Sequence, residues 1–137
     1  MEEIKYSFEK FSKALNKLEE AIYKVEDDLD RDGVIQRFEF VYELAWKTLK
    51  LILRNEGIIC NSPNGCFKEG FKLGFIENAD VWRQIKEDRN LTSHTYDEFT
   101  AITIFENIKN KYLNEFLNLH KKIKNYIKEL DDAENSS

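Results

Sequence analysis

The most reactive side chains of this 137-residue sequence gather in one short segment, residues 88–96, which reads DRNLTSHTY. Arg89 carries a planar, permanently charged guanidinium that suits phosphate oxygens. His94 can accept and release protons near neutral pH. Together they could cleave RNA without a metal, with the ribose 2′-hydroxyl as the internal nucleophile. This spacing is a weak signal alone, and the alternative is a histidine that only satisfies a polar position near a helix start.

The elements around this segment must bring its side chains together. In an unbroken helix five residues rotate by about 140°, so Arg89 and His94 would not share a face. The sequence from Thr95 to Glu98 has the spacing of a capping box, which predicts that a helix begins at Thr95. Arg89 would then end one helix, His94 would lie in the turn, and Tyr96 would lie in the first turn of the next helix. All three could point at one concavity.

Apolar periodicity predicts helices along most of the chain. Apolar residues recur every three or four positions over residues 4–29 and again over residues 105–130. The acidic run at 27–33 should end the first helix, and Asp30 or Asp32 should cap the second. Further helices are predicted over residues 34–54, with Gly57 as C-cap, over 63–73 after Ser62 and Pro63, from Asn78 to about 89, and over 95–130.

These segments predict an all-α, antiparallel helical bundle of about five helices, similar to a four-helix bundle. The second helix is apolar on more than one side, which predicts a central position. The first and last helices should pack together, because residues 1–30 hold five lysines against nine acidic residues, whereas 109–128 hold six lysines and one glutamate. We expect one domain over residues 1–130 and a disordered tail over 131–137.

Composition restricts the class of protein and its surroundings. The net charge is -5, which argues against nucleic-acid binding by bulk charge but leaves room for a local basic site. The N-terminus is neither a signal nor a transit peptide, and no apolar run could span a membrane. We therefore expect a cytoplasmic protein in which Cys60 and Cys66 are reduced, partly buried thiols. Their spacing does not suit a zinc site.

Three charged residues of the second helix allow different interpretations. Glu39 and Glu43 are four positions apart on one face, so they could bind a metal or act as acid and base. The interpretation that we prefer is structural, with Arg37 and Glu43 making polar contacts that line a cleft or a dimer interface. The neighbouring aromatic side chains fit a core or interface better than a base-stacking platform.

Residues 36–47, QRFEFVYELAWK, followed by residues 88–96 make the chain resemble the nucleotidyltransferase substrate-binding protein family, part of the HEPN superfamily of small helical proteins. The resemblance extends from about residue 4 to residue 130. It implies a helical bundle that dimerises and a partner, a minimal nucleotidyltransferase. It also implies a toxin–antitoxin pair, in which the helical protein is the toxin.

In active HEPN proteins an Arg-x4-6-His motif cleaves RNA without a metal or other cofactor, at a composite site where the motifs of two subunits meet. Arg89 and His94 match that motif, and Asn90 matches a polar residue often found after the arginine. In one branch a tyrosine follows two positions after the histidine, and the nucleotidyltransferase antitoxin transfers AMP onto it. Tyr96 stands at that position, where the alternative is a half-buried packing tyrosine.

The resemblance thus implies a metal-independent endoribonuclease toxin that a nucleotidyltransferase inhibits. A second hypothesis is a non-catalytic subunit that holds nucleotide or substrate for the nucleotidyltransferase in the same cleft. A third is a purely structural helical dimer, which ranks last because a core has no use for an exposed arginine, histidine and tyrosine at one turn.

Overall fold

The structure is a computed structural model that describes residues 1–136, and all regular elements in that range are helical. The helices are α1 (Glu2–Ile22), α2 (Asp28–Asn55), α3 (Pro63–Lys72), α4 (Ala79–Leu91), α5 (Glu98–Asn107) and α6 (Leu113–Ser136). A 3-10 turn, Thr92–His94, follows α4, and a π-helical turn, Ile108–Tyr112, joins α5 to α6. Because α5, the π-helical turn and α6 form one continuous helical run, the described chain has five helices. This confirms the predicted fold class.

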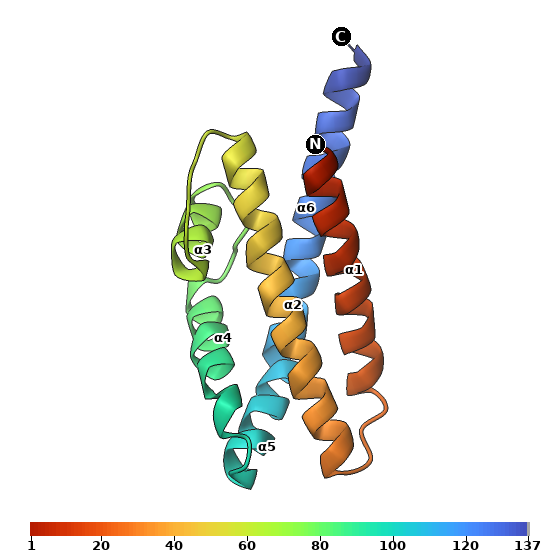
Figure 1. The fold of residues 1–137 in the computed structure, drawn as a ribbon, viewed down its shortest axis with the longest axis vertical. Coiled ribbons are helices and arrows are strands. Elements are labelled where there is room, and N and C mark those ends of the chain that lie inside the picture. The colour runs from red at the N-terminus through yellow and green to blue at the C-terminus, as the bar shows by residue number, and fades with distance from the viewer. Residues whose placement is uncertain (137) are drawn as a thin grey trace.

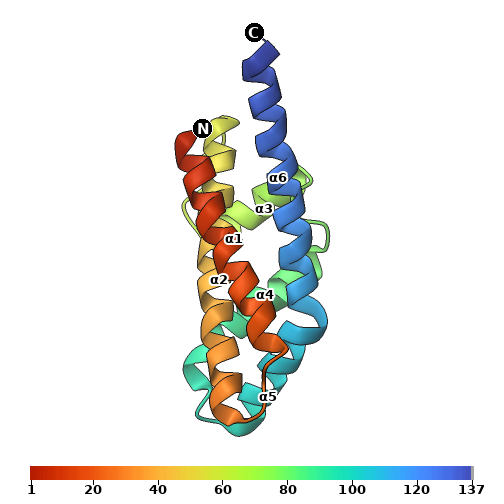
Figure 2. The ribbon, with the colours of Figure 1, turned by 90° about the vertical axis from the view of Figure 1, so that its right-hand side faces the viewer.

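The central helix is α2, which lies between α1 on one side and α3 and α4 on the other (Figure 1). It contacts α1, α3, α5 and α6, and Figure 2 shows α1 running beside both α2 and α6. Core side chains leave α2 in several directions, and Phe38, Leu49 and Leu53 among them are inaccessible to solvent. This confirms the predicted central position. Among residues 1–136, no helix has both the length and the apolar character to cross a membrane.

The boundary between α1 and α2 differs from the prediction. α1 ends at Ile22, and α2 already begins at Asp28, so Gly33 lies inside α2. Asp27, not Asp30 or Asp32, is the N-cap, and its carboxylate accepts the backbone N–H of Asp30. Acidic side chains stabilise a helix N-terminus because backbone N–H groups and the helix dipole are positive there. An acidic residue therefore caps the second helix as expected, but it is Asp27, so the helix begins at Asp28 rather than at residue 34.

The predicted starts of α3 and α4 and the predicted end of α2 are confirmed. Ser62 caps α3 by accepting the backbone N–H of Gly65, and Pro63 stands at the first helical position. Asn78 caps α4 by accepting the N–H of Val81. Gly57, after α2, has a φ of 81°, the left-handed backbone that glycine adopts without strain.

Cys60 and Cys66 form a disulfide, so the expectation of two reduced thiols is wrong. The connector after α2 turns at Ser62 into the first turn of α3, which brings the two Cα atoms to 5.2 Å. That separation lies within the range that a disulfide spans. The bridge links the buried Cys66, near the start of α3, to the connector.

The last helical run begins later and extends further than its periodicity predicts. α5 begins at Glu98 rather than Thr95, and α6 continues through Ser136. The segment that we expected as a disordered tail is therefore helical as far as residue 136, while Ser137 lies outside the described residues. Lys5 of α1 forms an ion pair of 2.8 Å with Asp131 in this extension.

The first and last helices pack together as predicted, but not through the charges that suggested it. Phe8 of α1 stacks on His120 of α6 with ring centroids 4.7 Å apart, and the hydroxyl of Ser12 is 2.8 Å from His120 Nε2. Lys122 of the basic segment pairs instead with Glu77, before α4, at 2.9 Å. A lysine on the surface can reach whichever carboxylate is nearest, so the opposite net charges of the two segments do not decide their pairing. The contacts that join α1 to α6 here are aromatic and polar.

Candidate functional site

Arg89 lies in the last turn of α4, where the helix tightens into the 3-10 turn. The hydroxyl of Thr92 donates to the backbone oxygen of Arg89 at 2.7 Å and accepts from Arg89 Nη1 at 3.2 Å. Thr92 is buried, so this small polar contact fixes both the end of the helix and the direction of the guanidinium. Thr92 is a supporting residue that sequence reasoning missed, although it stands inside the segment that drew attention.

The guanidinium of Arg89 faces two carboxylates of α2. Nη1 lies 3.7 Å from Glu39 Oε2, and Nη2 lies 3.9 Å from Glu43 Oε1. These distances allow an ion pair but are too long for hydrogen bonds. Within the described residues, the buried Nε of Arg89 also has no hydrogen-bond partner. The arginine is therefore held in place by charge while keeping N–H donors that a phosphate group could use.

Glu43 connects the arginine to an aromatic side chain on its own helix. Trp46 Nε1 donates to Glu43 Oε2 at 3.0 Å, and Lys47 Nζ lies 4.0 Å from the same oxygen. The structure thus places Glu43 in polar contacts at this site. Among residues 1–136, no group of three His, Cys, Asp or Glu side chains is arranged to hold a metal ion.

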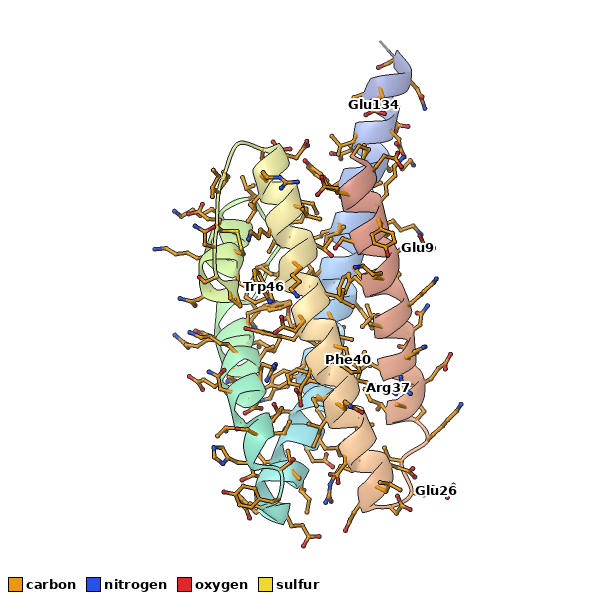
Figure 3. All side chains as sticks on the ribbon, viewed as in Figure 1. Glu9, Glu26, Arg37, Phe40, Trp46 and Glu134 are labelled. Carbon is orange, nitrogen blue, oxygen red and sulfur yellow. A yellow bond between two sulfur atoms is a disulfide. The ribbon has the colours of Figure 1, made fainter. Side chains whose placement is uncertain are left out.

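Arg37 does not belong to this arrangement. Figure 3 shows it on the side of α2 that faces α1, whereas Trp46 projects toward the opposite side. Arg37 lines a groove with Lys17, Glu20 and Lys24 of α1 and the segment after it. The structure therefore separates Arg37 from Glu43, with which it was grouped from sequence.

Asp88, next to Arg89, anchors the end of α4 to the last helical run. Its Oδ2 accepts hydrogen bonds from the hydroxyl of Tyr112 at 2.5 Å and from Asn107 Nδ2 at 2.9 Å. Burial, and then the bond to Asp88, raise the pKa of Tyr112 far above its usual value. Asn107 directly precedes the π-helical turn and Tyr112 is its last residue. No local sequence pattern pairs them with Asp88.

His94 and Tyr96 lie together on the surface after α4. His94 Nδ1 is 3.3 Å from the hydroxyl of Tyr96, and their rings meet edge to face at 5.9 Å. Tyr96 is 85% exposed, which excludes the half-buried packing role considered for it. The N-cap of α5 is Asp97, so the predicted capping box at Thr95 is wrong and Tyr96 lies before the helix, not in its first turn. Thr95 is the C-cap of the 3-10 turn and has a helical backbone, not the extended backbone of a helix N-cap.

The described residues of one chain do not bring Arg89 and His94 into contact. Arg89 points toward α2, whereas His94 is solvent-exposed beside Tyr96. A groove of about 410 Å³ separates the start of α2 from this turn and is lined by Glu39 and Thr95, among others. Asn90 is exposed on α4, and its backbone oxygen accepts the hydroxyl of Ser93 at 3.3 Å. Of the three side chains predicted to point at one concavity, His94 and Tyr96 lie together, whereas Arg89 faces α2.

Most of the chain matches a known family. Residues 6–125 match the family described as "Nucleotidyltransferase substrate binding protein like". A curated relative, the "Probable ribonuclease HepT" of Haemophilus influenzae, is 35% identical over 81 residues. That alignment covers 56% of this chain and 56% of the relative, so the chain spans little more than half the length of that protein.

Two solved structures share the fold. A protein from Thermus thermophilus superposes with a TM-score of 0.77 at 32% identity, covering 82% of this chain and 98% of the other. A Haemophilus influenzae protein superposes with a TM-score of 0.78 at 27% identity, covering 85% and 98%. The second structure is described as revealing the fold of a substrate-binding domain of a nucleotidyltransferase.

Proposed function

The chain belongs to the nucleotidyltransferase substrate-binding protein family, and we propose that it is a HEPN-type toxin, a metal-independent endoribonuclease with Arg89 and His94 as its catalytic residues. The observation that carries this proposal is the state of Arg89. Carboxylates at 3.7 and 3.9 Å hold its guanidinium without hydrogen-bonding it, at the end of a helix whose next turn presents an exposed His94. Similarity to a probable ribonuclease supports the same reaction.

The proposed reaction needs only these two kinds of side chain. The 2′-hydroxyl oxygen of a ribose attacks the adjacent phosphorus, and the bond from phosphorus to the 5′ oxygen breaks. His94 takes the proton of the 2′-hydroxyl and returns a proton to the leaving 5′ oxygen. Arg89 stabilises the charge that grows on the phosphoryl oxygens. The products are a 2′,3′-cyclic phosphate and a 5′-hydroxyl, so no water is consumed in this step.

A site made by two copies of the chain supports this chemistry better than one copy. In a single chain His94 lies on the surface and does not contact Arg89, so one copy holds the two catalytic groups apart. We propose a homodimer in which the turn of each copy faces that of its partner. Arg89 of one copy and His94 of the other would then act on the same phosphate.

Inhibition by a nucleotidyltransferase partner would use Tyr96. In the proposed transfer, the phenol oxygen attacks the α-phosphorus of ATP bound to that partner, and pyrophosphate leaves. His94 Nδ1, 3.3 Å away, is placed to take the phenol proton. The 85% exposure of Tyr96 makes its hydroxyl accessible to a partner's active site. The attached AMP would then block RNA by its bulk and negative charge.

The direct test is RNA cleavage by the purified chain in EDTA. We expect cleavage by the wild type, and a fall of about 100-fold or more in rate for His94→Ala, since general acid–base catalysis contributes that much. Ser93→Ala is the matched control, because Ser93 is exposed in the same turn and contacts only a backbone oxygen. A wild-type chain that cleaves no RNA beside an active positive control would contradict the proposal.

The family description favours a second function, a non-catalytic subunit that holds nucleotide or substrate for a nucleotidyltransferase. The separation of Arg89 and His94 within one chain fits this role as well. Adenine-nucleotide binding that is lost in Arg89→Ala, together with no RNA cleavage by the wild type, would favour this function over the first.

A further inference from the structure

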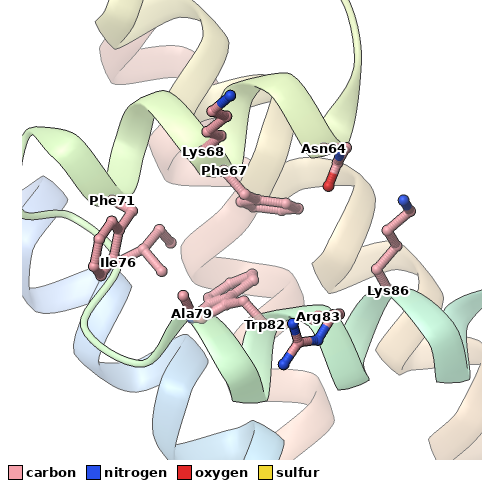
Figure 4. A pocket seen from close by; sticks show the side chains of 9 residues that line it. All are labelled: Asn64, Phe67, Lys68, Phe71, Ile76, Ala79, Trp82, Arg83 and Lys86. Carbon is pink, nitrogen blue, oxygen red and sulfur yellow. The ribbon is translucent and has the colours of Figure 1, made fainter.

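A cavity of about 250 Å³ lies between α3 and α4, away from the carboxylates that hold Arg89 (Figure 4). Its lining combines aromatic rings with cationic side chains from both helices. Among the described residues, the lining includes no carboxylate. The side chains that matter here are Phe67, Lys68 and Phe71 of α3 and Trp82, Arg83 and Lys86 of α4.

The aromatic wall of this cavity is rigid. The rings of Phe67 and Trp82 are nearly buried and meet with their centroids 4.6 Å apart. The indole N–H of Trp82 donates to the buried Glu115 of α6 at 3.3 Å, which fixes the ring. Phe71 is 50% exposed, so its ring face remains available to a ligand. An exposed aromatic face over a fixed apolar wall is a suitable platform for a nucleobase.

The cations at the cavity favour an anionic ligand. Within residues 1–136, neither Lys68 nor Lys86 forms an ion pair, while Arg83 pairs with Asp80 of the same helix. Figure 4 shows Lys68 on one side of the aromatic rings, with Arg83 and Lys86 on the other. A ligand with a flat apolar ring and a phosphate would satisfy both the rings and the lysines.

The cavity lies on the same face of α4 as the catalytic arginine. Lys86 is three positions before Arg89 and Trp82 is seven before it, spacings that repeat on one side of a helix. At 1.5 Å per residue, Lys86 is about 4.5 Å from Arg89 along the axis. That length corresponds to about one nucleotide step of about 3.4 Å in a stacked strand.

We propose that this cavity binds an unpaired nucleotide of the RNA strand whose neighbouring phosphodiester lies at Arg89, with the base on Phe71 and the phosphates on its two sides at Lys86 and Lys68. This inference rests on the proposed ribonuclease function. It assigns the enzyme single-stranded RNA, because an unpaired base can enter a cavity between two helices without the unstacking and unpairing energy that a duplex base would cost. Arg83 is already paired with Asp80, so its contact with the RNA phosphates is weaker than those of Lys86 and Lys68.

A second groove offers a rival site on the opposite side of α2. It lies between α1 and α2 and is lined by Lys10, Lys13, Arg37 and Phe40. Phe40 is 54% exposed, close to the exposure of Phe71. This groove is separated from Arg89 by α2 itself, so a strand in it would not continue along α4. The two phenylalanines therefore form a matched pair for a test.

The test measures binding of a fluorescein-labelled 2′-O-methyl RNA of about eight nucleotides, a length typical of single-strand sites, to the full-length chain. Methylation removes the attacking hydroxyl, so the probe cannot be cleaved. We expect Phe71→Ala to raise Kd by about 10-fold, the loss of one base-stacking contact. Phe71→Trp should keep the affinity and add indole fluorescence that the probe quenches. Phe40→Ala should bind as the wild type does.

Salt dependence tests the charged part of the proposal. Lys86→Gln should weaken binding and lower the slope of log Kd against log salt by about 0.7, the release of one counterion from a single strand. Lys13→Gln, whose lysine pairs with Glu9 at 3.7 Å, is the charge-matched control and should leave the slope unchanged. An unchanged slope in Lys86→Gln would overturn the assignment of phosphate to this lysine.

The remaining outcomes separate this inference from the proposed function. Phe71→Ala binding as tightly as the wild type, or Phe40→Ala binding less tightly, would overturn the inference while leaving wild-type cleavage in EDTA intact. ATP displacing the probe with the same sensitivity to Phe71→Ala would assign the cavity to free nucleotide instead. Normal RNA binding by Phe71→Ala with weaker binding of the nucleotidyltransferase would assign it to a protein partner. Probe binding by the wild type that needs Phe71, without cleavage of any RNA, would overturn the ribonuclease and leave the cavity as a nucleotide site.

Discussion

Arg89 is held in place by its neighbours but keeps N–H donors that are not hydrogen-bonded. Ion pairs with Glu39 and Glu43 neutralise part of its charge, and Thr92 takes one of its donors. The side chain as a whole is 31% exposed, although its Nε is buried. A bidentate hydrogen bond to a phosphate is stronger than these long ion pairs. RNA could therefore replace the carboxylates as partners of the guanidinium with little movement of the side chain.

Tyr96 gives the clearest prediction for a single residue. Tyr96→Phe removes the phenol oxygen that is proposed to accept AMP but keeps the exposed ring, so we expect RNA cleavage to persist. After co-expression with its nucleotidyltransferase, intact-protein mass spectrometry should find AMP on the wild type and none on Tyr96→Phe. Tyr23→Phe, which changes another highly exposed tyrosine, should still carry AMP. AMP on the Tyr96→Phe chain would disprove the assignment.

At the scale of helices, the end of α4 is fastened to the π-helical turn. Asp88 accepts from Tyr112 and Asn107, and a π turn adds the residue that rotates an inward side chain relative to an α-helical run. The position of Arg89, proposed as a catalytic residue, thus depends through its neighbour Asp88 on the geometry of a helix to which it does not belong.

Tyr112→Phe tests this connection. The hydroxyl is lost from a fully buried ring that bonds a carboxylate, so we expect the free energy of unfolding to fall by about 1.5–3 kcal/mol. Urea denaturation provides the measurement, with Tyr23→Phe as the exposed control. Stability equal to that of the wild type would show that Asp88 does not need this donor.

The contact between α1 and α6 predicts a dependence on pH. Burial against Phe8 and Phe11, and then the nearby Lys124, lower the pKa of His120 below its usual value near 6.5. Below about pH 6.5 the unfolded chain binds the proton more readily than the folded chain, so acidification favours unfolding. The loss stops growing once the pH passes below the lowered pKa of the folded state.

The measurement compares free energies of unfolding near pH 7.5 and near pH 5.5, on either side of the usual histidine pKa. The wild type should lose more stability across this interval than His120→Gln. His94→Gln, which alters the exposed second histidine of the chain, should lose as much as the wild type. Equal losses in wild type and His120→Gln would rule out this histidine as the source.

At the scale of the whole molecule, the proposed active site needs two copies of the chain. A mixture of Arg89→Ala and His94→Ala chains, unfolded and refolded together, should recover activity that neither variant has alone. Half of the randomly formed dimers would be mixed, each with one intact site, so about a quarter of wild-type activity should return in a two-fold symmetric dimer. No recovery, despite mixed dimers detected by native mass spectrometry, would contradict a site built from one residue of each copy.

Much of the helical organisation could be predicted from the sequence, because it depends on interactions between residues that are close in the chain. Apolar side chains at helical spacing fixed the number of helices and the central place of α2. Ser62, Asn78 and Gly57 marked helix ends correctly, since caps act within one turn of the backbone. The acidic segment gave a wrong N-cap and a wrong start for α2, because carboxylates that end a helix at one position cap a helix at another. The capping box at Thr95 misled because nothing local predicts the 3-10 turn that precedes it.

The residues of the candidate site also divide into those that the sequence predicted and those that only the tertiary structure identified. Arg89, His94 and Tyr96 stood out by type and spacing, so the sequence by itself determined the chemistry that the turn can support and the family to which the chain belongs. Only the tertiary structure decided which groups meet: Glu39 and Glu43 with Arg89, Tyr112 with Asp88, and Cys60 with Cys66, while Arg37 was excluded. Helix propensity and capping are set by neighbours in the chain, whereas these contacts depend on how distant helices rotate and pack against one another.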